Sequence, residues 1–428
     1  MKAMAATSRR TMRLADAINS TKGRLNISGV GPRFGSMKLA TAITRGALTL
    51  AVLSALLLIA ARPAHALTES VLHSFANNGT DGYEPYAGLA IDPKGNLYGT
   101  THMGGPFNAG TVFKVTPKGT ETVLYSFTGG TDGAYPFFAG VVRDKAGNLY
   151  GTTSSGGVNN LGTVFKLTPT GTETVLHSFA NDGTDGSVPL AGLVLDKTGN
   201  LYGTTYAGGA SGAGTVFKVD PSGTETVLYS FTAGTDGCYP YNAGVVLGKK
   251  GVLYGTTSSC GASGFGTVFK LTPTGTETVL HSFNADGTDG VYPDAGLAID
   301  SKSNLYGITH VGGATGYGTV FKLTPTGTET VLHSFNADGT DGIYPFAGLV
   351  LDKTGNLYGT THYGGAIGYG TVFMVTPSGT ETVLYSFGGS PDGAYPQAGV
   401  VFGNKGILYG TTIASGANGQ GTVFKLVP

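Results

Sequence analysis

The acids that could do chemistry in this chain are few, and most of them recur at fixed positions of a repeat. Glu84 and Asp294 are the two acids outside repeated positions that we expect on one face of the molecule. A glycosidase of the usual kind needs two carboxylates in one cleft, so these two are the candidate pair for polysaccharide cleavage. Because they fall four repeat units apart, we predict no catalytic residue here.

Three histidines could hold a metal ion if the fold brought them together. His102, His310 and His362 follow the same short strand in the first, fifth and sixth units, and imidazole is a common ligand of Zn²⁺. Their spread over separate units predicts no metal site. The other histidines of the repeat alternate with tyrosine at one position, as expected of a half-buried packing site: His73, Tyr125, His177, Tyr229, His281, His333 and Tyr385.

Aspartate and glutamate mark two further repeated positions. An Asp-Gly pair occurs once per unit, at Asp81, Asp132, Asp185, Asp236, Asp289, Asp341 and Asp392. We interpret it as a turn capped by the aspartate side chain. The alternative is a ring of Ca²⁺ sites, whose spacing does not match an EF-hand loop, so no cofactor is predicted. Seven of the eight glutamates begin one strand of the unit and are interpreted as a ladder on the outer surface: Glu69, Glu121, Glu173, Glu225, Glu277, Glu329 and Glu381.

The repeat that positions these residues is marked by the tripeptide Leu-Tyr-Gly. It starts at Leu97, Leu149, Leu201, Leu253, Leu305, Leu357 and Leu408, and a period of about 50 residues indicates a stacked or circular architecture. The third unit predicts four short strands, over 191–196, 201–205, 214–219 and 224–231. Four antiparallel strands per unit are typical of a β-propeller blade. The mid-strand glycine of Leu-Tyr-Gly predicts close backbone approach between neighbouring blades.

The phase of the repeat predicts how a ring would close. Residues 68–75 match the fourth strand of a unit with no first three before it, and residues 421–426 match a third strand with no fourth after it. The N-terminal strand would complete the last blade and leave no unpaired strand there. We therefore predict an all-β, seven-bladed β-propeller of four-stranded antiparallel blades over residues 67–428. An open solenoid, the structural alternative, would need atypical capping repeats, and we find none.

Residues 1–66 are predicted to be a leader. An apolar run at 46–61 follows two basic residues and precedes an Ala-His-Ala sequence, the arrangement of a secretory signal peptide cleaved after Ala66. Met37 is an alternative start that would give a signal of ordinary length. An uncleaved membrane anchor is the alternative to cleavage.

The charge balance after the leader limits the partners. Ten of the 26 basic residues but only one of the 26 acidic residues precede residue 67, which leaves 16 basic against 25 acidic residues. A mildly acidic surface disfavours phosphate backbones, so we predict no nucleic-acid partner. We expect a monomer, with no membrane contact after cleavage of the signal.

The two cysteines both fall in the fourth unit. Cys238 and Cys260 lie in the two long loops of that unit, and other units carry different residues at these positions. In an exported protein, two thiols on adjacent loops predict a disulfide. Two unpaired thiols are the alternative, and Cα atoms more than about 7 Å apart would exclude the bridge.

Residues that differ between units are the candidates for ligand binding. Immediately before the Ala-Gly that opens the first strand of each unit stand Tyr86, Phe138, Leu190, Asn242, Asp294, Phe346 and Gln397. If the first strand is innermost, these residues ring the mouth of the central channel, on the face of the long loops. Aromatic, amide and carboxylate groups suit sugar rings, which stack and hydrogen-bond. Plain packing between blades is the alternative.

The unit DxxGNLYGTT…GG…GTVFKLTPxGTETVLYSF…DGxYPxAG resembles the GloVer tandem repeat of exported bacterial proteins, over the whole of residues 67–428. The resemblance implies an extracellular or surface location and no established activity. The predicted signal peptide leads us to expect a secreted, extracellular or periplasmic protein. We expect a non-catalytic binding module for glycans or cell-surface proteins, since near-identical units suit multivalent binding. An extracellular polysaccharide hydrolase or lyase with its site at the channel mouth is one alternative, and a structural spacer is another.

Overall fold

The computed structural model describes residues 67–180 and 182–428, which fall within one compact unit. The predicted leader, with its signal peptide and the alternative start at Met37, lies outside the described residues. In the part of the chain that the structure describes, no helix is long and apolar enough to cross a membrane.

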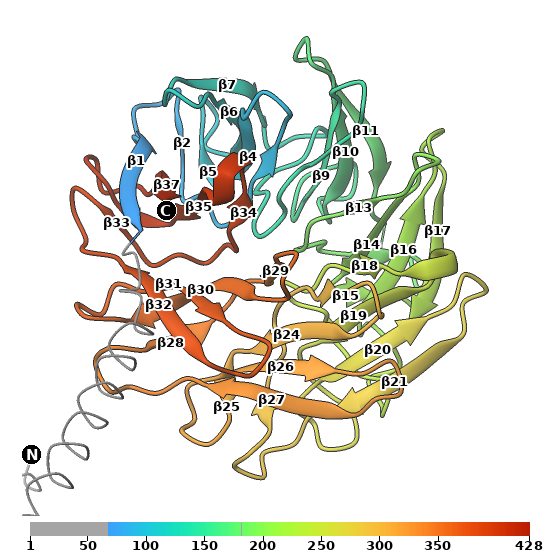
Figure 1. Ribbon diagram of the computed structural model, residues 1–428. Helices are drawn as coiled ribbons and strands as arrows, with labels where there is room; N and C mark the ends of the chain where they lie inside the picture. The colour runs from blue at the N-terminus through green and yellow to red at the C-terminus, as the bar shows by residue number, and fades with distance from the viewer. Residues whose placement is uncertain (1–66, 181) are drawn as a thin grey trace, which may run out of the picture. The chain divides into compact units, whose positions relative to one another are not determined.

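The described residues form seven antiparallel sheets of four or five strands, arranged as the blades of a seven-bladed β-propeller (Figure 1), and four small two-stranded sheets. From the innermost to the outermost strand, the first blade is β3 (Ala90–Ile91), β4 (Leu97–Thr101), β6 (Thr111–Val115) and β7 (Glu121–Ser126). The second blade is β8 (Val142–Arg143), β9 (Leu149–Thr153), β10 (Thr163–Leu167) and β11 (Glu173–Ser178). The third blade is β13 (Val194–Leu195), β14 (Leu201–Thr205), β16 (Thr215–Val219) and β17 (Glu225–Ser230). The fourth blade is β18 (Val246–Leu247), β19 (Leu253–Thr257), β20 (Thr267–Leu271) and β21 (Glu277–Ser282). The fifth blade is β23 (Ala298–Ile299), β24 (Leu305–Thr309), β26 (Thr319–Leu323) and β27 (Glu329–Ser334). The sixth is β29 (Val350–Leu351), β30 (Leu357–Gly364), β31 (Thr371–Val375), β32 (Glu381–Ser386), to which β28 (Gly342–Pro345) adds through β30.

Shorter elements extend the loops of the blades. Two-residue strands pair the long loops of four blades: β2 (Gly82–Tyr83) with β5 (Met103–Gly104), β12 (Gly186–Ser187) with β15 (Ala207–Gly208), β22 (Gly290–Val291) with β25 (Val311–Gly312), and β33 (Gly393–Ala394) with β36 (Ala414–Ser415). Two single turns of 3₁₀ helix, η1 (Lys249–Gly251) and η2 (Asn404–Gly406), replace the tight turn after the first strand in the fourth and seventh blades.

The seventh blade combines the two ends of the propeller, as the phase of the repeat predicts. It consists of β34 (Val401–Phe402), β35 (Leu408–Thr412), β37 (Thr422–Val427) and β1 (Thr68–Ser74). β1 runs antiparallel to β37, with Thr68 opposite Val427 and Ser74 opposite Thr422, and the two strands lie side by side in Figure 1. The ring is thus closed by a hydrogen-bonded ladder, and β37 has no free edge.

Local sequence explains the tight turn between the first two strands. In the third blade, the Asp196 side chain accepts hydrogen bonds from the backbone N–H groups of Thr198 and Asn200, at 2.8 and 2.9 Å, and Gly199 takes a φ of 92°. An aspartate followed by a glycine that tolerates the left-handed region is a common turn device. The turn places β13 beside β14, with Val194 opposite Tyr202 and Leu195 opposite Leu201.

Phenylalanine rings join neighbouring blades through the core. Phe75, after β1, packs edge-on against Phe113 in β6, with ring centroids 5.1 Å apart. The same contact recurs at the other junctions, as Phe127–Phe165, Phe179–Phe217, Phe231–Phe269, Phe283–Phe321, Phe335–Phe373 and Phe387–Phe424. Because these rings are almost fully buried, each pair contributes both apolar burial and an aromatic contact.

The glycine of Leu-Tyr-Gly makes room for one of these rings. A Cβ on Gly99 would lie 2.6 Å from Phe113 Cζ, and Phe113 is the residue opposite Gly99 within the same blade. Close backbone approach between blades occurs instead beside the channel, where a Cβ on Gly140 would lie 2.7 Å from the carbonyl oxygen of Gly88. The prediction that the Leu-Tyr-Gly glycine serves backbone approach between blades was therefore wrong.

The predicted disulfide is present in the fourth blade. Cys238 and Cys260 are bonded, with their Cα atoms 5.4 Å apart. The bond links the loop that enters the blade to the loop between β19 and β20, and Cys238 also exchanges backbone hydrogen bonds with Ser259. It therefore fastens two long loops on the same face as the channel mouth.

Candidate ligand site at the channel mouth

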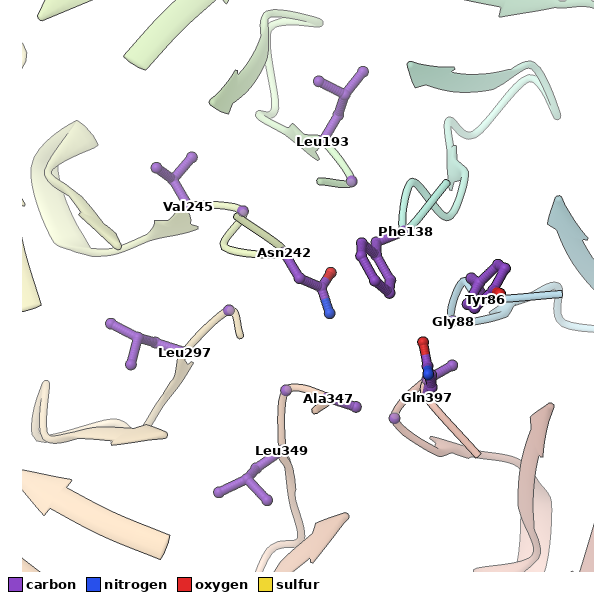
Figure 2. A pocket seen from close by; sticks show the side chains of 16 residues that line it. Tyr86, Gly88, Phe138, Leu193, Asn242, Val245, Leu297, Ala347, Leu349 and Gln397 are labelled. Carbon is purple, nitrogen blue, oxygen red and sulfur yellow. The ribbon is translucent and has the colours of Figure 1, made fainter. Parts of the chain in front are cut away.

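A cavity of about 320 Å³ lies where the loops into the seven innermost strands meet (Figure 2). Four of the seven predicted ligand residues line it, namely Tyr86, Phe138, Asn242 and Gln397, whereas Leu190, Asp294 and Phe346 are not among its lining residues. Phe138 and Asn242 project into the middle of the opening (Figure 2). Glycines of the Ala-Gly pairs supply much of the remaining wall, so exposed backbone as well as side chains faces the cavity.

Aromatic rings form a continuous arc beside this cavity. The Tyr86 ring lies 4.7 Å from that of Phe137, Phe137 lies 4.2 Å from Phe138, and Phe138 lies 5.4 Å from Tyr241. Tyr206 extends the arc at 5.9 Å from Tyr241. Such rings offer rigid apolar faces, and the tyrosines carry hydroxyl groups at their ends, while Asn242 and Gln397 add amide donors and acceptors.

Phe137 and Tyr241 belong to this arc although the sequence analysis did not single them out. In the second and fourth units two residues, not one, separate the proline from the Ala-Gly pair, and Phe137 and Tyr241 are the first of those two. An aromatic insertion at a position that otherwise keeps strict spacing was a signal that could have identified both residues.

The three histidines considered for a metal site do not converge. His310 and His362 lie on either side of Phe346, at ring distances of 4.0 and 5.7 Å, whereas His102 packs against Tyr86 at 5.6 Å. Burial lowers the pKa of His102 to about 4, and burial, with His310 nearby, lowers that of His362 to about 4. These imidazoles are neutral rings packed among aromatic side chains near neutral pH.

One of the two candidate acids contacts these histidines through its backbone, since the Glu84 carbonyl accepts a hydrogen bond from the His102 N–H at 3.0 Å. Burial raises the pKa of Asp294 to about 6 and also raises the pKa of Glu84. Among the described residues no hydrogen bond joins Glu84 to Asp294, and the histidine–carboxylate ion pairs found there all lie on the outer rim. Neither Glu84 nor Asp294 is among the residues that line the cavity.

The residue before the loop proline has a left-handed backbone in every blade. The φ angles lie between 55° and 59° at Glu84, Tyr135, Val188, Tyr239, Tyr292, Tyr344 and Tyr395. Each such residue that is not glycine costs about 1–3 kcal/mol, and such strain clusters at functional sites. Tyr135, Tyr239 and Tyr292 are 36–37% exposed, so the strained loops present tyrosine rings on the channel face.

A second set of side chains recurs on the outer rim between blades. A histidine or tyrosine in the outermost strand donates a hydrogen bond to the aspartate of the Asp-Gly pair, for example Tyr229 to Asp236 at 3.0 Å and His177 to Asp185 at 3.0 Å. The same aspartate accepts a backbone N–H in all seven loops, the capped turn that the sequence predicts.

The glutamate that begins the outermost strand completes each rim set from the following blade. These glutamates are half-buried, and their Oε1 atoms are buried without a hydrogen-bond partner among the described residues. Burial, followed by the charge of Asp236, raises the pKa of Glu277 to about 7. The interpretation of the seven glutamates as an outer surface ladder was therefore wrong, because the preceding blade covers them.

Comparison with known proteins identifies the repeat. The family model described as the Gloeobacter/Verrucomicrobia repeat matches residues 61–246 and 234–424. No curated protein matches the chain.

Solved structures share the fold at low sequence identity. The extracellular domain of a protein described as a hybrid two component system from B. thetaiotaomicron matches with a TM-score of 0.52 and 13% identity, over 85% of this chain and 41% of that chain. A puromycin hydrolase matches with a TM-score of 0.51 and 14% identity, over 78% of this chain and 50% of that chain. The chain thus spans half or less of these proteins, and the likeness concerns the propeller fold alone.

Proposed function

The chain belongs to the Gloeobacter/Verrucomicrobia repeat family, and from that premise we propose that it is an exported, non-catalytic module that binds a carbohydrate chain at the channel mouth. The observation that carries the proposal is the arc of Tyr86, Phe137, Phe138 and Tyr241 beside a cavity lined by Asn242 and other polar groups. Sugar rings have apolar faces that stack on aromatic rings and hydroxyl groups that hydrogen-bond to amides.

Export is supported by two observations. The Cys238–Cys260 disulfide is a feature of oxidising compartments, and an extracellular domain has the same fold.

The test begins with a glycan array probed with the purified protein, followed by calorimetry with the best ligand. We expect Tyr86→Ala to weaken binding about tenfold, because Tyr86 lines the cavity and a nucleic-acid base stacked on one aromatic ring contributes about 1–3 kcal/mol. Ile367→Ala is the matched control, since Ile367 is 61% exposed but does not line the cavity. Absence of binding to any glycan, or equal affinity of the Tyr86 variant, would contradict the proposal.

The predicted alternatives give different outcomes in the same experiments. Release of reducing sugar that is lost in Glu84→Gln or Asp294→Asn would favour a hydrolase or lyase. Binding to a cell-surface protein but to no glycan would instead favour a protein-binding site formed by the exposed tyrosines of the strained loops. A spacer would show neither binding nor turnover.

A further inference from the structure

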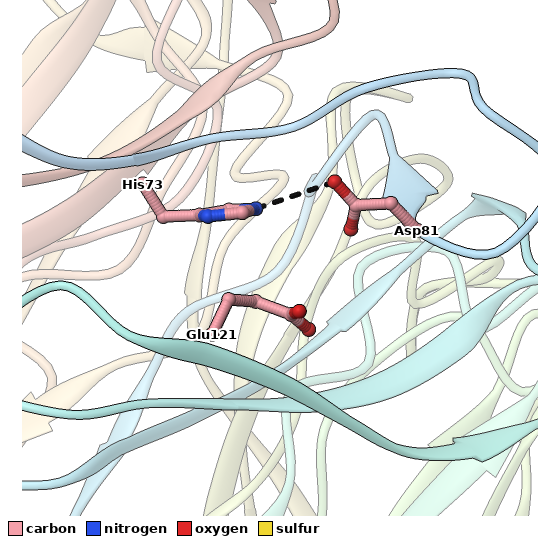
Figure 3. Close-up of side chains that lie close together, drawn as sticks. All are labelled: His73, Asp81 and Glu121. Carbon is pink, nitrogen blue, oxygen red and sulfur yellow. Dashed lines mark hydrogen bonds and ion pairs between the residues drawn. The ribbon is translucent and has the colours of Figure 1, made fainter.

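The strongest unassigned feature of the propeller is a pair of histidine–aspartate–glutamate clusters on the outer rim, which share no residue with the cavity at the channel mouth. In the first, His73 from β1, Asp81 from the following loop and Glu121 from β7 direct their polar atoms toward one another (Figure 3). In the second, His177, Asp185 and Glu225 have the same arrangement. In each cluster the three potential ligand atoms lie within 4.8 Å of one another.

Two carboxylate oxygens of the first cluster lack partners. The Asp81 side chain is 10% exposed, and its Oδ1 is buried with no hydrogen-bond partner among the described residues, as is Glu121 Oε1. In Asp185, Asp289 and Asp341 the corresponding oxygen accepts the next backbone N–H at 2.6–2.8 Å. A buried carboxylate oxygen without a donor is costly, and a cation is the group that would satisfy both oxygens.

We infer that the His73–Asp81–Glu121 cluster, and the equivalent His177–Asp185–Glu225 cluster, bind a divalent transition-metal ion of the Zn²⁺ type. The ligand set of one imidazole and two carboxylates is one that Zn²⁺ accepts, with bonds of about 2.0–2.2 Å. Two such ligands at a tetrahedral angle stand about 3.4 Å apart, and His73 Nε2 lies 3.3 Å from Asp81 Oδ2. Ca²⁺ prefers six to eight oxygen ligands and fits this set poorly.

A neighbouring side chain explains why two other clusters with the same three residues are not included. In the loops after β21 and β27, Asn284 and Asn336 each donate a side-chain N–H to the aspartate oxygen that faces the histidine, at 3.2 Å. Alanine stands at the corresponding positions, Ala76 and Ala180, in the two proposed sites. The amide therefore competes for an oxygen that a metal ion would use. At Ala76 and Ala180 that residue donates only its backbone N–H to this oxygen, at 2.9 Å, and no side-chain amide competes.

The second site has room for more than the metal ion. A surface cavity of about 500 Å³ is lined by His177, Asp182, Asp185 and Glu225, among other residues. Three protein ligands leave a coordination position for water or for a ligand carboxylate. The proposed ion would also connect consecutive blades, because the histidine and aspartate come from one blade and its loop and the glutamate comes from the next.

The propeller itself supplies the matched variant for testing this inference. Tyrosine takes the place of the histidine at Tyr125, Tyr229 and Tyr385 and makes the same hydrogen bond to aspartate, at 2.8–3.0 Å. The double variant His73→Tyr/His177→Tyr should therefore fold normally while losing both imidazole ligands. His281→Tyr is the control. It also replaces histidine by tyrosine, but in a cluster where the Asn284 amide already donates to the aspartate oxygen and where we expect no ion.

The experiment is titration of the EDTA-treated full protein with ZnCl₂, followed by calorimetry and thermal unfolding. We expect saturable binding of two ions per chain and a rise in Tm of about 3 °C or more at saturating Zn²⁺, both lost in the double variant and kept in His281→Tyr. Glu121→Gln and Glu225→Gln should each remove one ion. Unchanged Zn²⁺ binding in the folded double variant, loss of binding in His281→Tyr alone, or binding of Ca²⁺ but not Zn²⁺ would overturn the inference. The outcome is independent of glycan binding at the channel.

Discussion

The side-chain amide of Asn242 donates a hydrogen bond to the backbone carbonyl of Phe346, 3.0 Å away. Asn242 belongs to the loop entering the fourth blade and Phe346 to the loop entering the sixth, so the bond crosses the channel mouth between blades that are not neighbours. Asn242 also lines the cavity. One side chain therefore connects the shape of the candidate site to the spacing of two distant loops.

Replacing Asn242 by leucine should weaken ligand binding more than stability. The variant loses one hydrogen bond, a loss of about 1 kcal/mol, and one amide at the site, so we expect the affinity for the best glycan to fall about tenfold. Calorimetry measures this effect. Asn159→Leu is the control, because Asn159 donates the same kind of bond to the Phe179 carbonyl but does not line the cavity. Equal losses in both variants would contradict a specific role of Asn242.

Alanine in place of the Leu-Tyr-Gly glycine should destabilise the propeller. In Gly99→Ala the new Cβ would lie 2.6 Å from the buried Phe113 ring, and such overpacking costs about 1–3 kcal/mol. Urea unfolding of the purified variant measures the change in the free energy of unfolding. Gly88→Ala serves as the comparison, since a Cβ there meets no atom within 4 Å, and it should leave stability nearly unchanged.

If β1 completes the seventh blade, the phenylalanine that follows β1 should contribute as much to stability as its equivalent after β7, whose blade is one continuous segment of the chain. Phe75→Ala removes a buried ring contact between the seventh and first blades, and Phe127→Ala removes the equivalent contact between the first and second. Each should lower the free energy of unfolding by about 3–5 kcal/mol. A much smaller effect for Phe75→Ala would mean that β1 does not complete the seventh blade in solution.

The rim glutamates should make the propeller less stable as the pH rises. Burial, followed by the charge of Asp132, raises the pKa of Glu173 to about 7 from 4.5, and Glu277 behaves in the same way beside Asp236. A carboxyl group with a raised pKa holds its proton more tightly in the folded state, so its stabilisation is full below pH 4.5 and is lost as the pH rises through about 7.

Thermal unfolding in EDTA between pH 4.5 and 8 measures this dependence. We expect the Tm to fall over that range, and the fall to be smaller in the double variant Glu173→Gln/Glu277→Gln, whose amides cannot ionise. An unchanged slope of Tm against pH in the double variant would show that these glutamates do not cause the fall.

Much of the fold followed from the order of residues. The Leu-Tyr-Gly spacing gave the blade length, and the unmatched strands at 68–75 and 421–426 gave the closed ring, because strand count and phase are properties of the chain that packing cannot alter. The disulfide followed from two cysteines on loops of one unit. The role of Gly99 could not be predicted from the sequence. A glycine in the middle of a strand gives the same sequence pattern whether it faces a neighbouring backbone or an aromatic ring such as that of Phe113.

The sequence by itself determined the repeat, the seven blades and the positions where units differ, since periodicity is carried along the chain. Only the tertiary structure decided which of those positions meet at the channel. Phe138 and Asn242 line the cavity while Leu190 and Asp294 do not, although all four occupy the same place in their units. It also brought Glu121 beside His73 and Asp81 from the preceding blade, a contact set by the path of the outermost strands around the rim.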